Sequence, residues 1–278
     1  MGHGGTVAPL SRDLVASRAI FAFMTRPFVR VVDLETTGSR PPAHAVCEVG
    51  WQDVALGEDG AWHVTDSRGS TLIDPQRPIP AVTQAVHHIV DEDVVGAPLW
   101  ADVAPDVLLP EGCLALAAHR ASFERRFCMP ALPADARESV RWICTWKSAL
   151  RLFPGSPSFS NQVLRYWRKP EGLDRATGLP VHRAFPDAYV SAHHLRDMLA
   201  LTDVDTLVRW EGQPGLLPRV PRGPERGTYW HELSEDRLAA HARDRDEDVR
   251  YSAANEQQRR RVGAAPPESG APVQTSFL

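Results

Sequence analysis

Two carboxylates at the end of one buried strand are the first residues in this sequence that could carry out chemistry. Residues 28–33 read Phe-Val-Arg-Val-Val-Asp, an apolar and β-branched run that predicts a buried strand, and Asp33 and Glu35 lie at its end. Because side chains of a strand alternate between faces, both carboxylates are expected on one face. They repel each other unless a cation lies between them, which indicates a hard divalent ion. Taken alone, they also fit an ordinary acidic pair at a strand–turn junction.

Two later segments carry residue types that suit metal or acid–base chemistry. The apolar run from Cys113 to His119 has strand length, and Glu124 falls in the first turns of a helix expected from about Ser122. Farther along, His182 and Asp187 are five residues apart, a spacing that does not place them on one helical face. It fits a histidine on a loop before a helix whose first turn contains the aspartate. Alone, Glu124 also fits a solvated helix charge, and His182 an ordinary loop residue.

An α/β domain over about residues 28–202 is expected to position these side chains. Strand patterns come first as a run and then alternate with helices, which predicts a mixed central sheet flanked by helices. Strands are expected at 28–33, 46–56, 69–73, 113–119 and 141–144. Helices are expected at 82–89, 100–108, from about 122, at 146–153 and at 186–201, with one short helix inside the Gly-, Pro- and Ser-rich stretch 154–181.

The segments outside this domain differ from it in composition. Residues 1–27 are expected to be a poorly ordered leader, with Met24 as an alternative start, and residues 203–218 a linker. Residues 219–262 form a small module rich in Arg, Asp and Glu, and the Ala-, Pro-, Gly- and Ser-rich residues 263–278 are expected to be a disordered tail.

Composition excludes several classes of function. The net charge of −4 argues against a strongly basic nucleic-acid binder, although not against one that uses metal ions to meet phosphate. No apolar stretch reaches the roughly 18–20 residues of a membrane helix and no signal peptide is convincing, so a cytoplasmic protein is expected. The sequence has no Gly-Lys dipeptide and hence no P-loop. Its four cysteines form no Cys-x-x-Cys pair, which favours free thiols in a reducing compartment.

In their order along the chain, the acidic and histidine segments resemble the three motifs of the DEDDh (DnaQ-like) 3′→5′ exonuclease superfamily, which has a ribonuclease H-like fold. The resemblance covers about residues 28–202. Asp33-Leu34-Glu35-Thr36-Thr37-Gly38 is similar to the first motif, Ala118-His119 through Phe123-Glu124 to the second, and His182 through Asp187 to the third. Pro78-Ile79 through His88-Ile89 resembles a family stretch that ends in His-Gly-Ile, and Trp142-Ile143-Cys144-Thr145, Leu152-Phe153-Pro154 and Ser160-Asn161 resemble the exonuclease X branch.

The resemblance implies hydrolysis of phosphodiester bonds with two Mg²⁺ ions, for which Mn²⁺ can substitute. Two ions about 4 Å apart can activate a water and stabilise the departing oxygen. By resemblance, Asp33 bridges the ions, Glu35 and Asp187 support the first, and Glu124 helps to hold the second, while His182 is the general base. The resemblance also implies that the backbone N–H groups of Thr36 and Thr37 face the terminal nucleotide, and that His88 and Ile89 contact the substrate.

Two residues depart from the family pattern and leave alternatives open. Glu124 stands where the family has Asp, and Arg120 where it usually has Asn. The extra methylene of Glu can misplace a ligand, and a misplacement near 1 Å can cost about 10²-fold in rate. The first hypothesis is an exonuclease that releases nucleoside 5′-monophosphates from single-stranded or frayed DNA 3′ ends, in repair or proofreading. The alternatives are trimming of RNA 3′ ends, as in ribonuclease T, and a weakly active or inactive nucleic-acid-binding module.

Several residues outside the motifs also carry expectations. Glu48 matches a family glutamate in the second strand, where a structural hydrogen-bonding role and a catalytic one both remain open. His193 and His194 are expected at the surface of the last helix of the domain, and Trp142 and Trp146 in the core.

The C-terminal part carries two weaker resemblances. Residues 221–233 resemble a short module appended to some exonucleases of this type, but Gly223-Pro224 replaces the usual Gly-Lys of that module. The final Gln274-Thr275-Ser276-Phe277-Leu278 loosely resembles a sliding-clamp-binding pentapeptide with its last two residues reversed. A sliding clamp is therefore a candidate partner, and a tail without function is the alternative.

Overall fold

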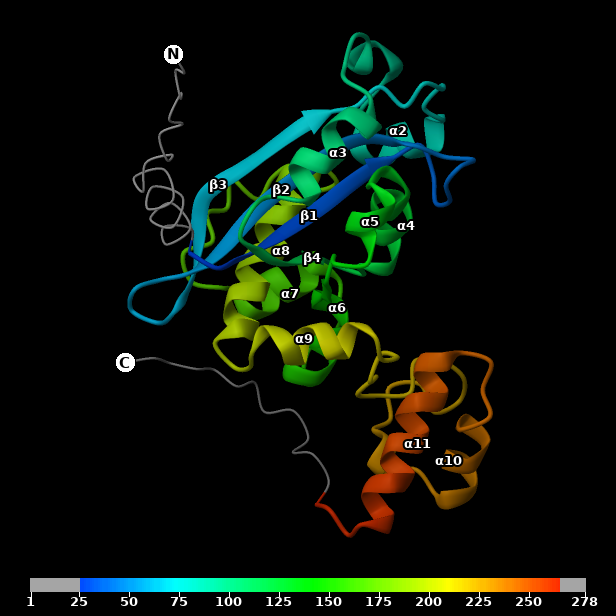
Figure 1. Ribbon diagram of the computed structural model, residues 1–278. Coiled ribbons are helices and arrows are strands. Elements are labelled where there is room, and N and C mark those ends of the chain that lie inside the picture. Colours follow the sequence, from blue (N-terminus) through cyan, green and yellow to red (C-terminus); the bar gives the residue numbers. More distant parts are fainter. Residues whose placement is uncertain (1–25, 266–278) are drawn as a thin grey trace, which may run out of the picture.

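A five-stranded mixed sheet lies at the centre of the computed structural model, which describes residues 26–265 (Figure 1). Its strands, in the order β3-β2-β1-β4-β5, are β1 (Phe28–Thr36), β2 (Val46–Leu56), β3 (Trp62–Leu72), β4 (Cys113–Ala118) and β5 (Trp142–Cys144). The first three strands pair antiparallel, whereas β4 pairs parallel with β1 and with β5. The predicted mixed α/β sheet is therefore confirmed. Most of the expected leader and tail, including Gln274–Leu278, lies outside the described residues.

Helices follow the strands in the alternating order that the sequence predicts. The helices before β5 are α2 (Ala81–His87), the short 3₁₀ helix η1 (Asp91–Val94), α3 (Trp100–Leu108), α4 (Ser122–Ala131) and α5 (Ala134–Arg137). The later ones are α6 (Thr145–Leu152), α7 (Asn161–Arg168), α8 (Ala184–Leu199), α9 (Val204–Glu211), the 3₁₀ helix η2 (Trp230–Glu232), α10 (Glu235–His241) and α11 (Glu247–Arg261). Between residues 26 and 265, no helix has the length and apolar character needed to cross a bilayer.

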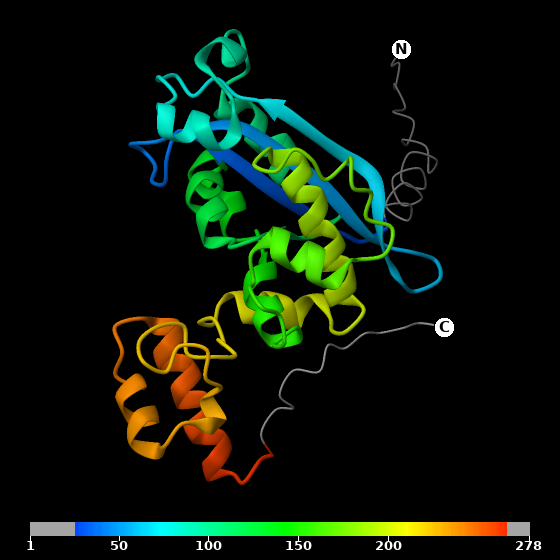
Figure 2. The same cartoon turned by 180° about the vertical axis from the view of Figure 1, so that it is seen from behind.

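Alternating side chains of β1 belong to two separate apolar cores. Val32 and Leu34 pack with α3 and α4 on one face of the sheet, and Val29 and Val31 pack with α7 and α8 on the other (Figures 1 and 2). Because side chains alternate along a strand, the odd-numbered residues of β1 all project toward the α8 face. Asp33 and Glu35 therefore lie on the side of the sheet that α8 covers.

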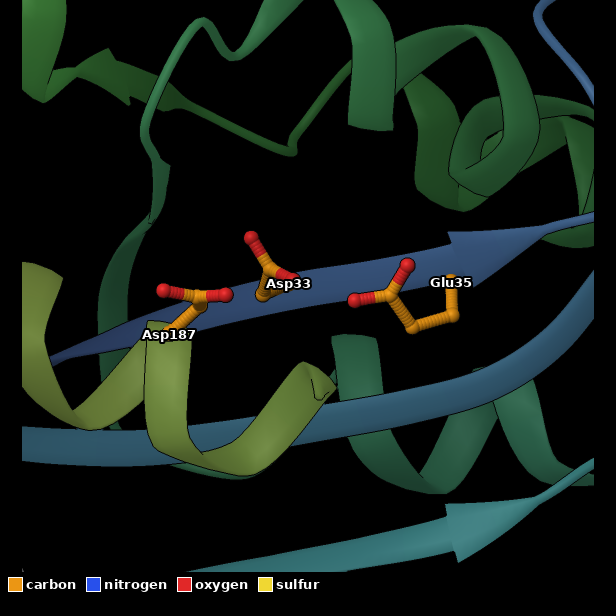
Figure 3. Close-up of side chains that lie close together, drawn as sticks. All are labelled: Asp33, Glu35 and Asp187. Carbon is orange, nitrogen blue, oxygen red and sulfur yellow. The ribbon is translucent and has the colours of Figure 1, made fainter. Parts of the chain in front are cut away.

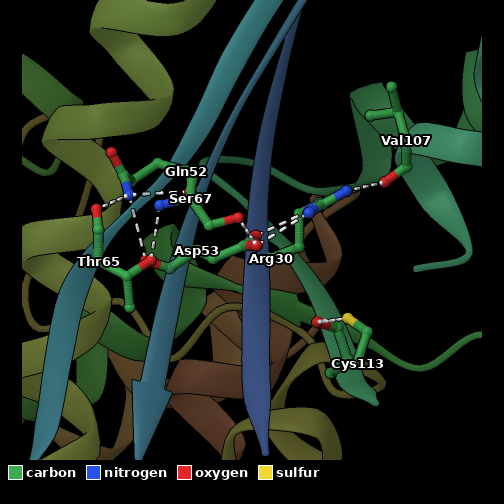
Figure 4. Close-up of polar contacts among 8 residues, drawn as sticks. Arg30, Gln52, Asp53, Thr65, Ser67, Val107 and Cys113 are labelled. Atoms are coloured by element: carbon green, nitrogen blue, oxygen red, sulfur yellow. Dashed lines mark hydrogen bonds and ion pairs between the residues drawn. The ribbon is translucent and has the colours of Figure 1, made fainter. Parts of the chain in front are cut away.

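A buried ion pair ties the other face of the sheet together (Figure 4). Arg30 of β1 is paired in register with Asp53 of β2 and donates two hydrogen bonds to its carboxylate, of 2.7 and 2.8 Å. Arg30 also donates to the main-chain oxygen of Val107 in α3, and Ser67 of β3 donates to the Asp53 carboxylate. Bidentate guanidinium–carboxylate geometry satisfies both charges inside the protein. The pair thereby links three strands and one helix without contributing to the acidic site.

The segment expected as a linker contains a helix. Helix α9 occupies residues 204–211, begins with Asp203 capping the Thr206 amide, and buries Leu207 in the core that α8 shares. The expectation of a linker over 203–218 is therefore wrong for this part. Beyond it, the Gly215 amide donates to Asp248 of α11, and η2, α10 and α11 enclose a small core of their own that includes Trp230.

Candidate active site

Three carboxylates from two elements meet at one end of the sheet (Figure 3). Asp33 and Glu35 come from β1, and Asp187 comes from the first turn of α8. One carboxylate oxygen from each residue lies within 4.8 Å of the others. The expectation that Asp33 and Glu35 share a face is confirmed, and the structure also brings Asp187 to them.

Glycine at position 50 allows α8 to start so close to the sheet. Gly50 of β2 is the register partner of Asp33, and a Cβ atom added there would lie 2.2 Å from the Phe185 nitrogen. The nearest atoms are all main-chain atoms of Ala184 and Phe185, which cannot turn aside as a flexible side chain can. A residue without a side chain therefore permits the approach that places Asp187 opposite Asp33.

Glu48 anchors the residues just before α8 to the same strand. The buried Glu48 carboxylate accepts hydrogen bonds from Nε and Nη2 of Arg183, at 2.9 and 2.7 Å, and from the Ala184 amide at 3.0 Å. Burial acts to raise the pKa of Glu48, but the bonds from Arg183 and Ala184 outweigh it and hold that pKa below its usual value. The structural hydrogen-bonding role that the sequence left open is the one observed.

The Asp187 carboxylate is itself held by neighbouring donors. The His182 amide donates to Oδ2 at 2.7 Å, and Nε2 of Gln162 donates to Oδ1 at 2.7 Å. Asn161 of α7 donates to the Asp187 main-chain oxygen at 3.1 Å. Gln162 was not anticipated as a site residue, and its neighbours Ser160 and Asn161 were the only sequence signal for this region.

The electrostatics of the cluster indicate a cation. Burial raises the pKa of Asp33 well above its usual value, and repulsion from Asp187 and Glu35 raises it further. Burial and repulsion from Asp187 also raise the pKa of Glu35 to about 8. The guanidinium of Arg183 only partly offsets this, because it is bound to Glu48. A hard oxygen donor set with unbalanced negative charge fits a divalent cation such as Mg²⁺.

Glu124 lies near this cluster but not in it. Its side chain is buried, and its Oε2 atom has no hydrogen-bond partner among residues 26–265. Burial raises its pKa to about 8, with a smaller contribution from Glu35, and its charge in turn raises the pKa of Asp33. The alternative of a solvated helix charge is therefore wrong. Its role as a metal ligand stays a prediction, because the carboxylates within 4.8 Å of one another do not include it.

A cavity of about 630 Å³ opens over the three carboxylates. Besides the acidic residues, its walls include Thr36, Phe123 of α4, the exposed His182, and His87, which sequence reasoning missed. A histidine on a loop before α8, with Asp187 in the first turn, is the arrangement predicted from the spacing of five.

Three of the expected nucleotide contacts do not line this cavity. The Thr37 amide, which was expected to face the nucleotide, donates to the Ala45 main-chain oxygen at 2.8 Å, and Thr37 is buried. His88 is exposed in a left-handed conformation at the end of α2, and its neighbour His87 lines the cavity instead. Ile89 packs in a small separate core with Cys47. The stretch Pro78–Ile89 does reach the cavity, but through His87. Which of its side chains face the cavity depends on the left-handed turn at His88 that ends α2.

Other residues differ from expectation in burial. His193 and His194 are buried, contrary to the expected surface location, because α8 packs between the sheet and helices α6 and α7. Trp142 lies in the core as predicted, whereas Trp146 is only partly buried. The Arg120 guanidinium lies over the Trp146 ring, 4.3 Å from the ring centroid. All four cysteines are free thiols, as predicted, although Cys113 is only partly buried.

Comparisons with known proteins agree with the geometry. The family model described as Exonuclease (RNase_T) matches residues 31–195. Exodeoxyribonuclease 10 of Escherichia coli (strain K12) is 31% identical over 209 residues, which cover 74% of this chain and 86% of that protein. The solved structure of exonuclease X in complex with 5′ overhanging duplex DNA is 31% identical with a TM-score of 0.53, covering 66% of this chain and 99% of that one. The DNA polymerase III subunit epsilon of Treponema pallidum (strain Nichols) is 28% identical over 186 residues, covering 65% of this chain and 80% of that protein.

The family match and the acidic cluster point to the same chemistry. The matched residues include Asp33, Glu35, Glu124, His182 and Asp187, so every predicted catalytic position falls inside the family domain. The mixed sheet flanked by helices belongs to a fold that is similar to that of the matched exonuclease structure. The chain therefore belongs to the exonuclease family, as a DnaQ-like 3′→5′ exonuclease with a ribonuclease H-like fold.

Proposed function

We propose that this protein is a divalent-metal-dependent exonuclease that shortens DNA from its 3′ ends and releases nucleoside 5′-monophosphates. The observation that carries the proposal is the group of three carboxylates, Asp33, Glu35 and Asp187, which meet within 4.8 Å under an open cavity. The choice of DNA is supported by a relative named as an exodeoxyribonuclease, which is 31% identical over most of both chains.

The three clustered carboxylates would hold one Mg²⁺ ion, and Asp33 with Glu124 would help to hold a second. When bound, such ions activate water and stabilise the negative charge that develops on a phosphate during hydrolysis. Besides burial, repulsion from Asp187, Glu35 and Glu124 raises the pKa of Asp33, so this carboxylate lies within the field of all three. This supports a role for Asp33 in holding both ions.

His182 would accept a proton from the attacking water at a ring nitrogen. This residue lines the cavity, and its main-chain amide is fixed by a 2.7 Å hydrogen bond to Asp187. A general base must lie within hydrogen-bond reach of the proton that it removes, and this bond keeps His182 next to the acidic cluster. The terminal nucleotide would lie between Thr36 and Phe123, where the aromatic ring offers a stacking surface for a base.

Degradation of end-labelled oligonucleotides tests this proposal. Single-stranded DNA and RNA of one sequence, labelled at the 5′ or the 3′ end, are incubated with Mg²⁺, Mn²⁺ or EDTA beside an Asp33→Ala variant. We expect 5′-labelled DNA to shorten stepwise with metal, and neither EDTA nor the variant to support shortening. Faster shortening of RNA would favour the ribonuclease T-like alternative. A folded protein that shortens neither polymer would favour a nucleic-acid-binding module. Glu124→Asp would then be the first variant to test for a gain of activity.

We further propose a cytoplasmic location and contact with a sliding clamp. The location is supported by four free thiols, which persist in reducing compartments. The clamp contact concerns Gln274–Leu278, outside the described residues, and rests on the sequence alone. In a pull-down, purified clamp should retain the full chain but not a variant that ends at Val273. Equal retention of both chains, or retention of neither, would contradict the proposed contact.

A further inference from the structure

Two histidines, the half-buried His119 and the fully buried His194, lie next to the loop that leads into α7. His119 directly follows β4, and its Nε2 atom lies 2.8 Å from the main-chain oxygen of Phe159. His194 belongs to α8, and its Nε2 atom lies 3.2 Å from the main-chain oxygen of Asn161. Two imidazoles from different elements therefore reach carbonyl groups of one three-residue segment, 159–161.

The partners of each ring fix which nitrogen carries the proton. A carbonyl oxygen can only accept, so Nε2 must donate in both histidines. The other nitrogen of His119, Nδ1, lies 3.0 Å from the Thr145 hydroxyl, which can donate to it. Burial lowers the pKa of His119 to about 4 and that of His194 well below its usual value. Both rings are therefore neutral, with one donor and one acceptor nitrogen each.

The segment that these rings hold is the one that contacts Asp187. Asn161 begins α7 and donates to the Asp187 main-chain oxygen, and the next residue, Gln162, donates to the Asp187 carboxylate at 2.7 Å. A loop that drifted from the histidines would carry both donors away from Asp187. We infer that His119 and His194 are positioning residues, which fix the Asp187 carboxylate by holding residues 159–161. The inference rests on the proposed function, in which Asp187 is a metal ligand.

The adjacent His193 is a matched control within the same helix. Its side chain is as buried as that of His194, but neither ring nitrogen has a hydrogen-bond partner among residues 26–265. It packs edge-on against Tyr189 instead. Replacing either histidine by Leu removes a buried ring from α8, and only His194→Leu also removes a bond to the segment 159–161. His194→Gln is the conservative variant, because its amide nitrogen is as many bonds from Cα as Nε2 of histidine.

The test compares full-length wild type, His194→Leu, His194→Gln and His193→Leu by two measurements. The first is hydrogen exchange in a peptide covering residues 158–164, and the second is Mn²⁺ affinity by calorimetry, with thermal unfolding as the control for folding. We expect His194→Leu to speed exchange in that peptide and to weaken Mn²⁺ binding about tenfold, the equivalent of one net hydrogen bond. His193→Leu and His194→Gln should stay within about threefold of wild type in affinity.

The two measurements separate this inference from the proposed function. Unchanged exchange of residues 158–164 in His194→Leu would overturn the inference, as would equal changes in His193→Leu. If His194→Leu does not fold, His119→Leu decides, because it removes the bond to the Phe159 oxygen: faster exchange of residues 158–164 supports the inference, and unchanged exchange overturns it. Wild type that binds no Mn²⁺ would refute the proposed metal site, and the exchange result would still decide whether the histidines hold the loop.

Discussion

Replacement of Gly50 by Ala should disable the site without unfolding the protein. An added Cβ would lie 2.2 Å from the Phe185 nitrogen and 2.3 Å from the Ala184 carbonyl carbon, whereas ordinary contact begins at 3.4 Å. The start of α8 must therefore retreat by roughly 1 Å, because a close-packed interior offers no space on the strand side. Asp187 lies in the first turn of α8 and moves with it.

The expected loss of activity follows from that displacement. A misplacement near 1 Å of a group that must be positioned can cost about 10²-fold in rate, and overpacking costs about 1–3 kcal/mol in the free energy of unfolding. We therefore expect Gly50→Ala to lower kcat about 100-fold on 5′-labelled DNA while it still unfolds cooperatively. Such a shift of the start of α8 would also lengthen the hydrogen bond from the Ala184 amide to Glu48.

Gly212→Ala provides the matched control for this substitution. Gly212 follows α9 with a φ of −71°, and an added Cβ would meet only the Arg209 oxygen at 3.7 Å, which is ordinary contact. We expect this variant to keep wild-type rates in the same oligonucleotide assay. A folded Gly50→Ala protein with activity within about threefold of wild type would refute the reasoning that the close approach of α8 is required.

Three further predictions concern the carboxylates around the site. Glu48→Ala should lower the free energy of unfolding by about 1–3 kcal/mol, because Arg183 and the Ala184 amide lose their acceptor. The same variant should reduce kcat more than it raises KM. Denaturant unfolding and steady-state rates check the two effects. Glu124→Asp should keep or raise the rate and Glu124→Ala should lower it tenfold or more; a sharp loss in the first or none in the second would contradict a ligand role. The metal-free protein should lose stability as pH rises from about 6.5 to 8, because burial raises the pKa of Glu35 and Glu124 to about 8 and their ionised forms destabilise the fold. Below about 6.5 the lowered pKa values of His119, His193 and His194 act in the opposite direction. A melting temperature that rises over this range in EDTA, or falls equally in saturating Mg²⁺, would contradict that cause.

The central strands were predictable because burial leaves a clear pattern in them. β1 and β4 are near-continuous apolar runs, as expected for strands covered on both faces. The edge strand β3 begins at Trp62, well before the expected start at Gly69. The early part was missed because its side chains are mostly polar and none of them is buried. Without a buried face, the residues from His63 to Arg68 give no hydrophobic alternation to find.

Helix α9 was missed for a related reason. Only Leu207 of its eight residues is fully buried, and the prolines that follow it suggested a linker. The Asp203 side chain that caps the Thr206 amide was the available signal for a helix start. Asp followed by an apolar residue is common in loops too, so this signal is weak without the packing that the tertiary structure supplies.

The candidate site was predictable where chemistry restricts the residue type. Asp33, Glu35 and Asp187 carry the charge that a cation requires, and their order along the chain matches the family motifs. Gln162 was missed because its role depends on the path of a loop and not on a spacing. The burial of His194 was not predicted because histidine occurs both at surfaces and in interiors, and the packing of α8 against its neighbours decides which.

Anomalous diffraction from crystals soaked in Mn²⁺ tests most directly whether the three carboxylates form a metal site. We expect an anomalous peak bound by oxygens of Asp33, Glu35 and Asp187, which is lost in crystals of Asp187→Asn. A second peak near Asp33 and Glu124 would support the two-ion arrangement. Crystals of active protein that bind Mn²⁺ elsewhere, or that show no peak between the carboxylates, would contradict the assignment of this cluster as the catalytic metal site.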